Sequence, residues 1–329
     1  MTASVESVLE SVFGNTAQHI YSQSLPTILN EFGTAVVGSF GYVIGGNNQF
    51  FGGGALNTVY VTSLGLPDTD GPVTSSLVVT PNPVVVNMPI SLSAVVDDSN
   101  SGNSIVASAR YRVDGGAWIA MGAQDSDFNS VLENVTADIG PFSTADAKEI
   151  CVQGTDAAGN TGPESCILLA IYDPTGGFVT GGGWINSTAG AYRADLTLTG
   201  KANFGFVSKY QKGANIPTGN TEFQFKTGNL NFSSTAYDWL VIAGARAQYK
   251  GTGTINGGND NGSGYAFMLT AIDGQVNGGG GVDKFRIKIW KKSDGTIVYD
   301  NQVGSGVDGS DTSDPVTAVG GGSIVIHKN

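Results

Sequence analysis

The two cysteines of the chain have the spacing and the neighbours of a disulfide. Cys151 and Cys166 each stand in a stretch of alternating apolar residues whose apolar members, and not the cysteine, face the core. A turn at 157–162 joins the stretches, so the cysteines lie nearly opposite each other on one face of a hairpin. Cysteines so placed can oxidise, and disulfides persist in oxidising compartments. The sequence predicts a Cys151–Cys166 disulfide and an extracellular or cell-surface location; two free thiols on a solvated sheet are the alternative.

Loops rich in aspartate indicate oxygen ligands for a metal ion. Asp97 and Asp98 end one alternating stretch, and Asp156 and Asn160 flank a later loop. Carboxylate and amide oxygens are the ligands that calcium takes in extracellular modules, where it binds weakly and stiffens a linker. These four residues are the predicted site of a structural calcium ion, and no other cofactor is required. Asp and Asn also cap turns without a metal, and that alternative stays open.

One stretch near the C-terminus combines an aromatic ring with two cations. The apolar residues of 285–290 share one face of a strand, which leaves Arg286, Lys288 and Trp290 on the other face. A Trp beside two cations on an outward face could stack on a pyranose ring. These three residues are therefore the predicted ligand-binding set, with a polysaccharide or a surface protein as partner. The alternative is that cation–π contacts or a neighbouring loop cover the ring.

The usual catalytic arrangements are missing from the sequence. His19 and His327 are the only histidines, and neither lies in a recognisable motif. A Ser–His–Asp arrangement needs a histidine beside its nucleophile, and a zinc hydrolase usually needs two or three histidine ligands. The glycine runs at 181–183 and 278–281 precede neither Lys-Ser/Thr nor a helix, so they are not phosphate loops. The chain is predicted not to be an enzyme.

Composition narrows the class of protein and of partner. The chain has 329 residues, of which 13% are charged and 49 are Gly, a mixture typical of short strands joined by tight turns. The net charge of −12 disfavours nucleic acid, which needs clustered Lys and Arg. Neither a signal peptide nor an apolar run long enough to span a membrane is present, so we expect a mature form or a fragment with no membrane span.

Most of the chain is predicted to be all-β. Residues 67–72 are predicted to be a linker, because they include two prolines, one glycine and two aspartates. Residues 73–173 alternate with period two between turn signals, which indicates an Ig-like sandwich. Residues 174–329 contain many short strands with Gly-rich joints, which indicates a larger β-sandwich or jelly-roll-like domain.

The first part of the chain, residues 1–66, is harder to interpret. Apolar residues at helical spacing predict a short helix near residues 4–13. The segment 32–67 is uncharged, strand-like in pieces and too rich in glycine for a core of its own. Residues 1–66 are therefore predicted to be a docking segment or the remnant of an upstream domain. The strands join either their own chain or, by self-association, another chain.

The sandwich regions resemble known extracellular families. The stretches Tyr111–Trp118 and Gly154–Asn160, with Pro81-Asn82-Pro83 before them, resemble a bacterial Ig-like repeat of the kind found in tandem on large extracellular proteins. Residues 178–329, which follow the Ig-like region at 73–173, resemble a C-terminal β-domain that often follows such repeats. The matching stretches are 181–185, 200–206, 283–290 and 322–326. The resemblance implies the fold and an extracellular setting, and it carries no catalytic residues.

These observations lead to one main functional interpretation and two alternatives. The main one is a non-catalytic structural or adhesion module of a secreted or cell-surface protein. The first alternative is a carbohydrate-binding accessory module of a secreted hydrolase. The second is a self-assembling extracellular filament subunit that associates through residues 32–67. The identity of the ligand and the oligomeric state do not follow from the sequence.

Overall fold

The computed structural model describes residues 33–37, 40–44, 59–63, 68–303, 307 and 309–328. The chain forms two compact units, residues 1–70 and 71–329. In the described residues the regular elements are strands, apart from one 3₁₀ turn, Lys226–Gly228. The predicted all-β class is thus confirmed. None of the described residues form a helix that could cross a membrane, and the helix predicted near residues 4–13 lies outside the described residues.

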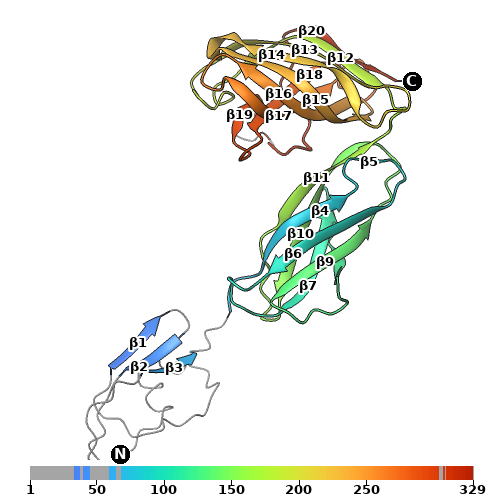
Figure 1. Ribbon diagram of the computed structural model, residues 1–329. Coiled ribbons are helices and arrows are strands. Elements are labelled where there is room, and N and C mark those ends of the chain that lie inside the picture. The colour runs from blue at the N-terminus through green and yellow to red at the C-terminus, as the bar shows by residue number, and fades with distance from the viewer. Residues whose placement is uncertain are drawn as a thin grey trace, which may run out of the picture. The chain divides into compact units, whose positions relative to one another are not determined.

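The first unit contains a small antiparallel sheet (Figure 1). Its strands are β1 (Gly33–Val37), β2 (Phe40–Ile44) and β3 (Val59–Ser63), in the order β1-β2-β3. These strands of the uncharged segment pair with one another, so they satisfy part of one another's backbone hydrogen bonding. Association of this segment with another chain stays a prediction.

The second unit begins with an eight-stranded sheet that folds over itself into a sandwich. Its order is β4-β6-β9-β8-β7-β10-β11-β5, antiparallel except for the pair β11–β5. The alternation predicted in this region is confirmed, because Ile90, Leu92, Ala94 and Val96 are all at most 3% exposed. The strands are β4 (Val73–Thr80), β5 (Val84–Val85), β6 (Ile90–Asp97), β7 (Val106–Val113), β8 (Ile119–Ala123), β9 (Leu132–Ile139), β10 (Asp146–Asp156) and β11 (Ser165–Tyr172).

The predicted disulfide lies on the outer face of this sandwich. Cys151 and Cys166 are direct partners in the register of β10 and β11, their Cα atoms are 4.1 Å apart, and the bond is formed. Ile150 and Val152, on either side of Cys151, are fully buried in the core. The predicted Cys151–Cys166 disulfide is therefore confirmed, and so is its position on the face of the sheet that points away from the core. In the chain-entropy model, closing a loop of this length stabilises the fold by about 3 kcal/mol.

The second sheet is a nine-stranded antiparallel meander with one strand added at its end. Its order is β19-β18-β17-β16-β15-β14-β13-β12-β20, so consecutive strands are neighbours and β20 returns to pair with β12. The sheet curls around an aromatic core in which the rings of Phe204 and Phe285 stack 4.2 Å apart. The strands are β12 (Phe178–Ser187), β13 (Gly200–Tyr210), β14 (Pro217–Phe225), β15 (Leu230–Ala243), β16 (Arg246–Asn256), β17 (Gly262–Ile272), β18 (Lys284–Lys291), β19 (Ile297–Asp300) and β20 (Gly321–His327).

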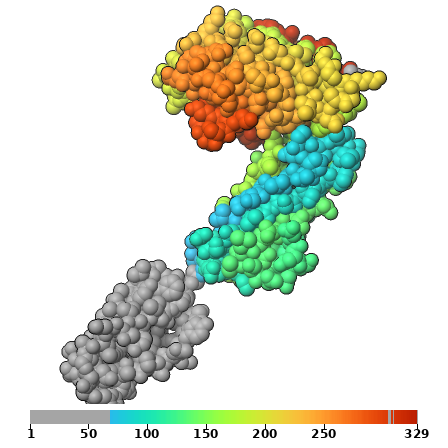
Figure 2. All heavy atoms as spheres, in the orientation of Figure 1, coloured from blue at the N-terminus to red at the C-terminus, as the bar shows by residue number. Residues whose placement is uncertain are grey.

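An apolar seam joins the two sandwiches within the second unit. Figure 2 shows the surface of this unit, coloured along the chain. Tyr172 of β11 stacks on Tyr210 of β13, with ring centroids 5.1 Å apart. Trp239 and Met268, both at most 5% exposed, pack in the same cluster. Neither large sheet contains strands from both sides of residues 173–177. Both sandwiches belong to one compact unit, so the predicted domain boundary at 173/174 stays a prediction. The predicted linker at 67–72 stays a prediction as well.

Two aspartates cover the outer edge of β20. The backbone amides of Ile324 and Ile326 donate to Asp283 Oδ2 and Asp273 Oδ2, each over 2.8 Å. Unpaired amides on an edge strand are a template for pairing with another chain. The two carboxylates take the place that a tenth strand would occupy, so they satisfy these donors and close the edge.

The edge contact gives a stability prediction. Asp273→Ala removes the acceptor of the Ile326 amide and should lower the free energy of unfolding by about 1–3 kcal/mol, the usual cost of a buried unsatisfied donor. Denaturant titration measures the change. The exposed turn residue Asp195, which accepts from Thr197, provides the control Asp195→Ala, and an equal loss in both variants would contradict the edge role of Asp273.

Candidate functional site

The structure does not place Arg286 at the surface. Its side chain is 2% exposed and pairs with Asp300 through Nε–Oδ1 and Nη2–Oδ2 distances of 3.1 and 2.8 Å. It also donates to the carbonyl oxygens of Gly309 and Ser310. The prediction of an outward face for Arg286 is wrong, because the loop at 309–314 covers this side of β18. Its guanidinium binds that loop, and a ligand contact of Arg286 stays a prediction.

The other two residues of the predicted ligand-binding set are also engaged. Lys288 pairs with Asp311 over 2.8 Å. Trp290 is half-buried and packs against the apolar seam, with the Nζ atoms of Lys250 and Lys288 at 5.9 and 5.6 Å from its ring centroid. These are the cation–π contacts that the sequence offered as the alternative. A ligand contact of Trp290 stays a prediction.

Two of the four predicted calcium ligands come together. Asp98, directly after β6, is 0% exposed, and Asp156, at the end of β10, is 2% exposed. One carboxylate oxygen of each lies within 4.8 Å of the other. Asp98 accepts a hydrogen bond from the Ser104 amide over 2.6 Å. The second unit thus buries two carboxylates side by side at one end of the first sandwich.

The remaining two predicted ligands have other roles. Asp97 projects from the opposite side of its strand, and hydrogen bonds from the side chain and the backbone amide of Ser99 lower the pKa of Asp97. Asn160 donates from its backbone and its side chain to Asp156, over 2.8 and 3.1 Å. Burial alone would raise the pKa of Asp156, but these hydrogen bonds outweigh it and lower the pKa. Calcium binding by the pair stays a prediction.

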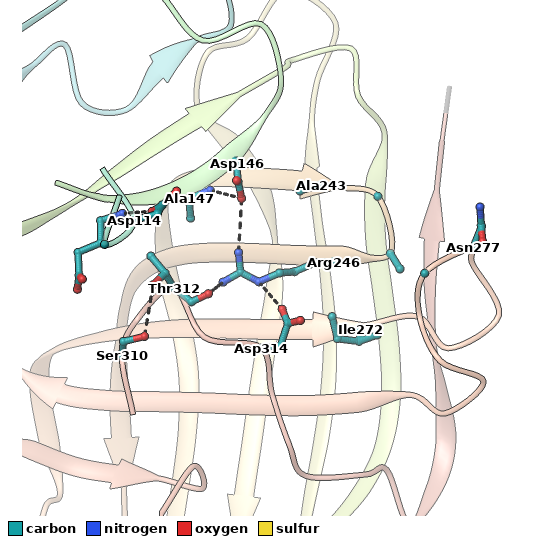
Figure 3. Close-up of a pocket in the computed structure, with 15 residues that line it drawn as sticks. Asp114, Asp146, Ala147, Ala243, Arg246, Ile272, Asn277, Ser310, Thr312 and Asp314 are labelled. Atoms are coloured by element: carbon teal, nitrogen blue, oxygen red, sulfur yellow. Dashed lines mark hydrogen bonds and ion pairs between the residues drawn. The ribbon is translucent and has the colours of Figure 1, made fainter. Parts of the chain in front are cut away.

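A polar cleft of about 800 Å³ lies beside the apolar seam, where the two sandwiches meet (Figure 3). Sequence reasoning did not find it, because its residues come from separate stretches of the chain. The first sandwich contributes Asp114, Gly115, Asp146, Ala147 and Glu149, and the second contributes Ala243, Gly244, Ala245, Arg246, Ile272, Asn277, Gly278, Ser310, Thr312 and Asp314.

Arg246, at the start of β16, is the central cation of the cleft (Figure 3). Its side chain is 11% exposed and lies between carboxylates, with Asp314 Oδ1 at 3.3 Å from Nε and Asp146 Oδ1 at 3.8 Å from Nη1. Nη2 donates to the carbonyl oxygen of Thr312 over 3.1 Å. Burial lowers the pKa of Arg246, and the two carboxylates oppose that shift. Nε is buried and has no hydrogen bond within the described part of the chain.

Lys148 neutralises two acids on the first sandwich's side of the cleft. Its Nζ lies 2.9 Å from Asp114 Oδ2 and 3.1 Å from Asp146 Oδ2. Burial alone would lower the pKa of Lys148, but the hydrogen bonds to these carboxylates raise it. The Asp-x-Lys spacing at 146–148 was a sequence signal for such a pair, since alternate residues share a face of a strand.

The arrangement can hold a ligand rich in hydroxyl groups. Arg246 supplies N–H donors at the wall of the cleft, and the carboxylates of Asp146 and Asp314 supply acceptors close by. A sugar hydroxyl both donates and accepts, so neighbouring hydroxyls can engage a guanidinium and a carboxylate together.

No family model and no curated protein matches the sequence. Among solved structures, an uncharacterized protein from Listeria monocytogenes EGD-e in complex with α-D-glucose, β-D-glucose, magnesium and calcium is 13% identical, with a TM-score of 0.22. The cycloalternan-forming enzyme from Listeria monocytogenes, in complex with a pentasaccharide substrate, is 13% identical, with a TM-score of 0.23. Each match covers 69% of this chain and 19% of the other protein, so the chain spans about a fifth of their length. TM-scores this low identify neither a common function nor a common site.

The ion pairs of Lys148 give a prediction with a defined pH dependence. Lys148→Met should lower the free energy of unfolding by about 1 kcal/mol at neutral pH, since these pairs are partly solvated. Because the pKa of Lys148 is raised in the folded protein, its contribution to the free energy of unfolding is complete below the pKa of an unfolded lysine, about 10.4. That contribution is lost as the pH rises through the pKa of Lys148 in the folded state. The difference from the wild type should therefore stay constant up to about pH 9 and shrink above about pH 11.

Urea denaturation at several pH values tests the role of Lys148. The exposed Lys209 forms no ion pair within the described residues and gives the matched control Lys209→Met. If the difference in the free energy of unfolding between the wild type and Lys148→Met grows with rising pH, Lys148 does not stabilise the fold through these ion pairs.

Proposed function

We propose that this chain is a non-catalytic, carbohydrate-binding accessory module of an extracellular protein, with its ligand in the cleft between the two sandwiches. The observation that carries the proposal is the polar cleft around Arg246, whose guanidinium lines the cleft between the carboxylates of Asp146 and Asp314. A sugar hydroxyl that accepts from this guanidinium gains a charge-assisted hydrogen bond, which contributes about 1.5–3 kcal/mol.

The dimensions and the rigidity of the cleft suit a small sugar chain. Ligand sites usually enclose roughly 300–1,000 Å³, and this cleft has about 800 Å³. The apolar seam of Tyr172, Tyr210 and Trp239 joins its two walls. Walls that are already in place reduce the ordering cost of binding, which supports recognition by hydrogen bonds alone.

The same acids support binding without catalysis. Glycoside hydrolysis needs a carboxylic acid with a raised pKa opposite a second carboxylate. Here Asp114 and Asp146 share the ammonium of Lys148, and Asp314 pairs with Arg246. All three acids are thus held in ion pairs with cations of the protein. The Cys151–Cys166 disulfide supports the extracellular setting.

A structural calcium ion at Asp98 and Asp156 is the second part of the proposal. Two buried carboxylates with oxygens within 4.8 Å of each other repel when both are ionised. A hard divalent cation removes that repulsion and prefers carboxylate oxygens. Its role is to hold the loops that follow β6 and β10, at one end of the first sandwich.

Glycan binding can be tested on the full chain by isothermal titration calorimetry with a panel of soluble oligosaccharides. Arg246→Met should weaken binding by at least about tenfold, because charge-assisted hydrogen bonds contribute about 1.5–3 kcal/mol each. The exposed Arg193 does not line the cleft and gives the control Arg193→Met. The proposal fails if no glycan binds, or if Arg246→Met binds as well as the wild type while retaining its circular dichroism spectrum.

Calcium binding is tested by thermal unfolding after chelation. Adding roughly 10 mM CaCl₂, well above the dissociation constants of extracellular modules, should raise Tm by roughly 5 °C. Asp98→Asn should abolish the rise, whereas Asp125→Asn, at an exposed turn residue, should keep it. A rise that survives Asp98→Asn would exclude this pair as the site.

A further inference from the structure

We infer that the ligand of the cleft is a sugar polymer that carries protonated amino groups, and that Glu149 selects it. This inference rests on the proposed function and adds the chemical class of the ligand. It starts from the position of Glu149, which lies on β10 and lines both the cleft and a second hollow of about 270 Å³.

The two hollows form one groove along the boundary of the sandwiches. Both are lined by Glu149 from the first sandwich and by Ser310 from the second. The second hollow continues past Lys288 and Asp311 to Cys166. Since the two hollows share residues on both walls, a ligand that passes from one to the other passes Glu149. A continuous groove of this kind suits several linked sugar units better than a single one.

Each acid that lines the groove in the described part of the chain contacts a cation of the protein, with one exception. Asp114 and Asp146 share Lys148, at 2.9 and 3.1 Å. Asp314 pairs with Arg246 at 3.3 Å, and Asp311 pairs with Lys288 at 2.8 Å.

Glu149 is the exception. Its backbone amide donates to Asp114 over 2.8 Å, but its carboxylate has no ion pair and no hydrogen bond within the described residues. Among the described acids that line the two hollows, Glu149 is therefore the one whose carboxylate contacts no cation of the protein.

The surroundings of Glu149 strengthen the attraction for a cation. Its side chain is half-buried, and a carboxylate oxygen lies within 4.8 Å of the sulfur atoms of Cys151 and Cys166. The disulfide offers no hydrogen-bond donor to this carboxylate. A partly desolvated carboxylate makes its strongest contact with a charged donor such as an ammonium group. The same charge repels a uronate, which excludes acidic sugar polymers from this groove.

The two recognition elements have separate roles. Arg246 and its flanking carboxylates bind hydroxyl groups, which every hexose polymer carries. Glu149 adds a contact that only an amine can complete. An oligomer of 2-amino sugars with free amines can satisfy both, whereas N-acetylation removes the positive charge and leaves only the hydroxyl contacts.

Calorimetry with matched oligosaccharides tests the inference on the full chain. The probes are glucosamine oligomers with free amines, their N-acetylated forms of equal length, neutral glucose oligomers and uronate oligomers. At low salt the free-amine form should bind at least about tenfold more tightly than the acetylated form, and uronates should bind least well. Raising the salt concentration should reduce this preference, because the added contact is between charges.

Variants then assign the preference to Glu149. Glu149→Gln should bring the ratio of the two affinities to about one, and Glu149→Asp, which keeps the charge, should retain a part of the preference. Glu222→Gln makes the same chemical change at an exposed position outside the groove and should leave the ratio unchanged. Thermal unfolding of each variant verifies that it is folded.

The outcomes separate this inference from the proposed function. If glycans bind through Arg246 with no preference for free amines, or with a preference that survives Glu149→Gln, the inference is wrong and the proposed function stands. Tighter binding of uronates would also overturn the inference. If none of the probes bind, the proposed function fails and the inference fails with it.

Discussion

The stacking of Tyr172 on Tyr210 is the contact on which the candidate site depends. Each ring comes from a different sandwich, and Trp239 and Met268 extend the contact into a small apolar cluster. Burial raises the pKa of both tyrosines, so both stay neutral. Buried aromatic rings contribute large apolar areas and prefer defined geometries. Because the seam fixes two polar surfaces against each other at its margin, residues that are remote in sequence can line one cleft.

The electrostatics of the cleft follow from that apolar contact. Placing Arg246 where it is 11% exposed requires carboxylates nearby, and they come from both sandwiches. Lys148 in turn compensates the acids of the first sandwich. Polar groups at the margin of an apolar seam are partly shielded from water, which strengthens each pair and makes an unmatched group costly. The Glu149 carboxylate, which pairs with no cation among the described residues, is therefore the group on which the proposed ligand contact depends.

The sequence predicted well what alternation and local turns decide. Period two assigned the core faces of the first sandwich, and a short hairpin placed Cys151 opposite Cys166. Alternation assigns a side chain to a face, but it does not reveal what covers that face, and Arg286 was misplaced because a distant loop packs over β18. The meeting of Asp146 with Arg246 could not be predicted, since it depends on the packing of two separately folded sheets.

The aspartates on the edge of β20 have a consequence for crowded surroundings. Copies of a protein that is displayed densely on a surface encounter one another at local concentrations far above those in dilute solution. An exposed row of amides would turn each such encounter into an opportunity for fibrous growth. Asp273 and Asp283 hold those amides inside the molecule. They also place negative charge where an approaching strand would present its carbonyl oxygens, which disfavours pairing of a neighbour's strand with β20.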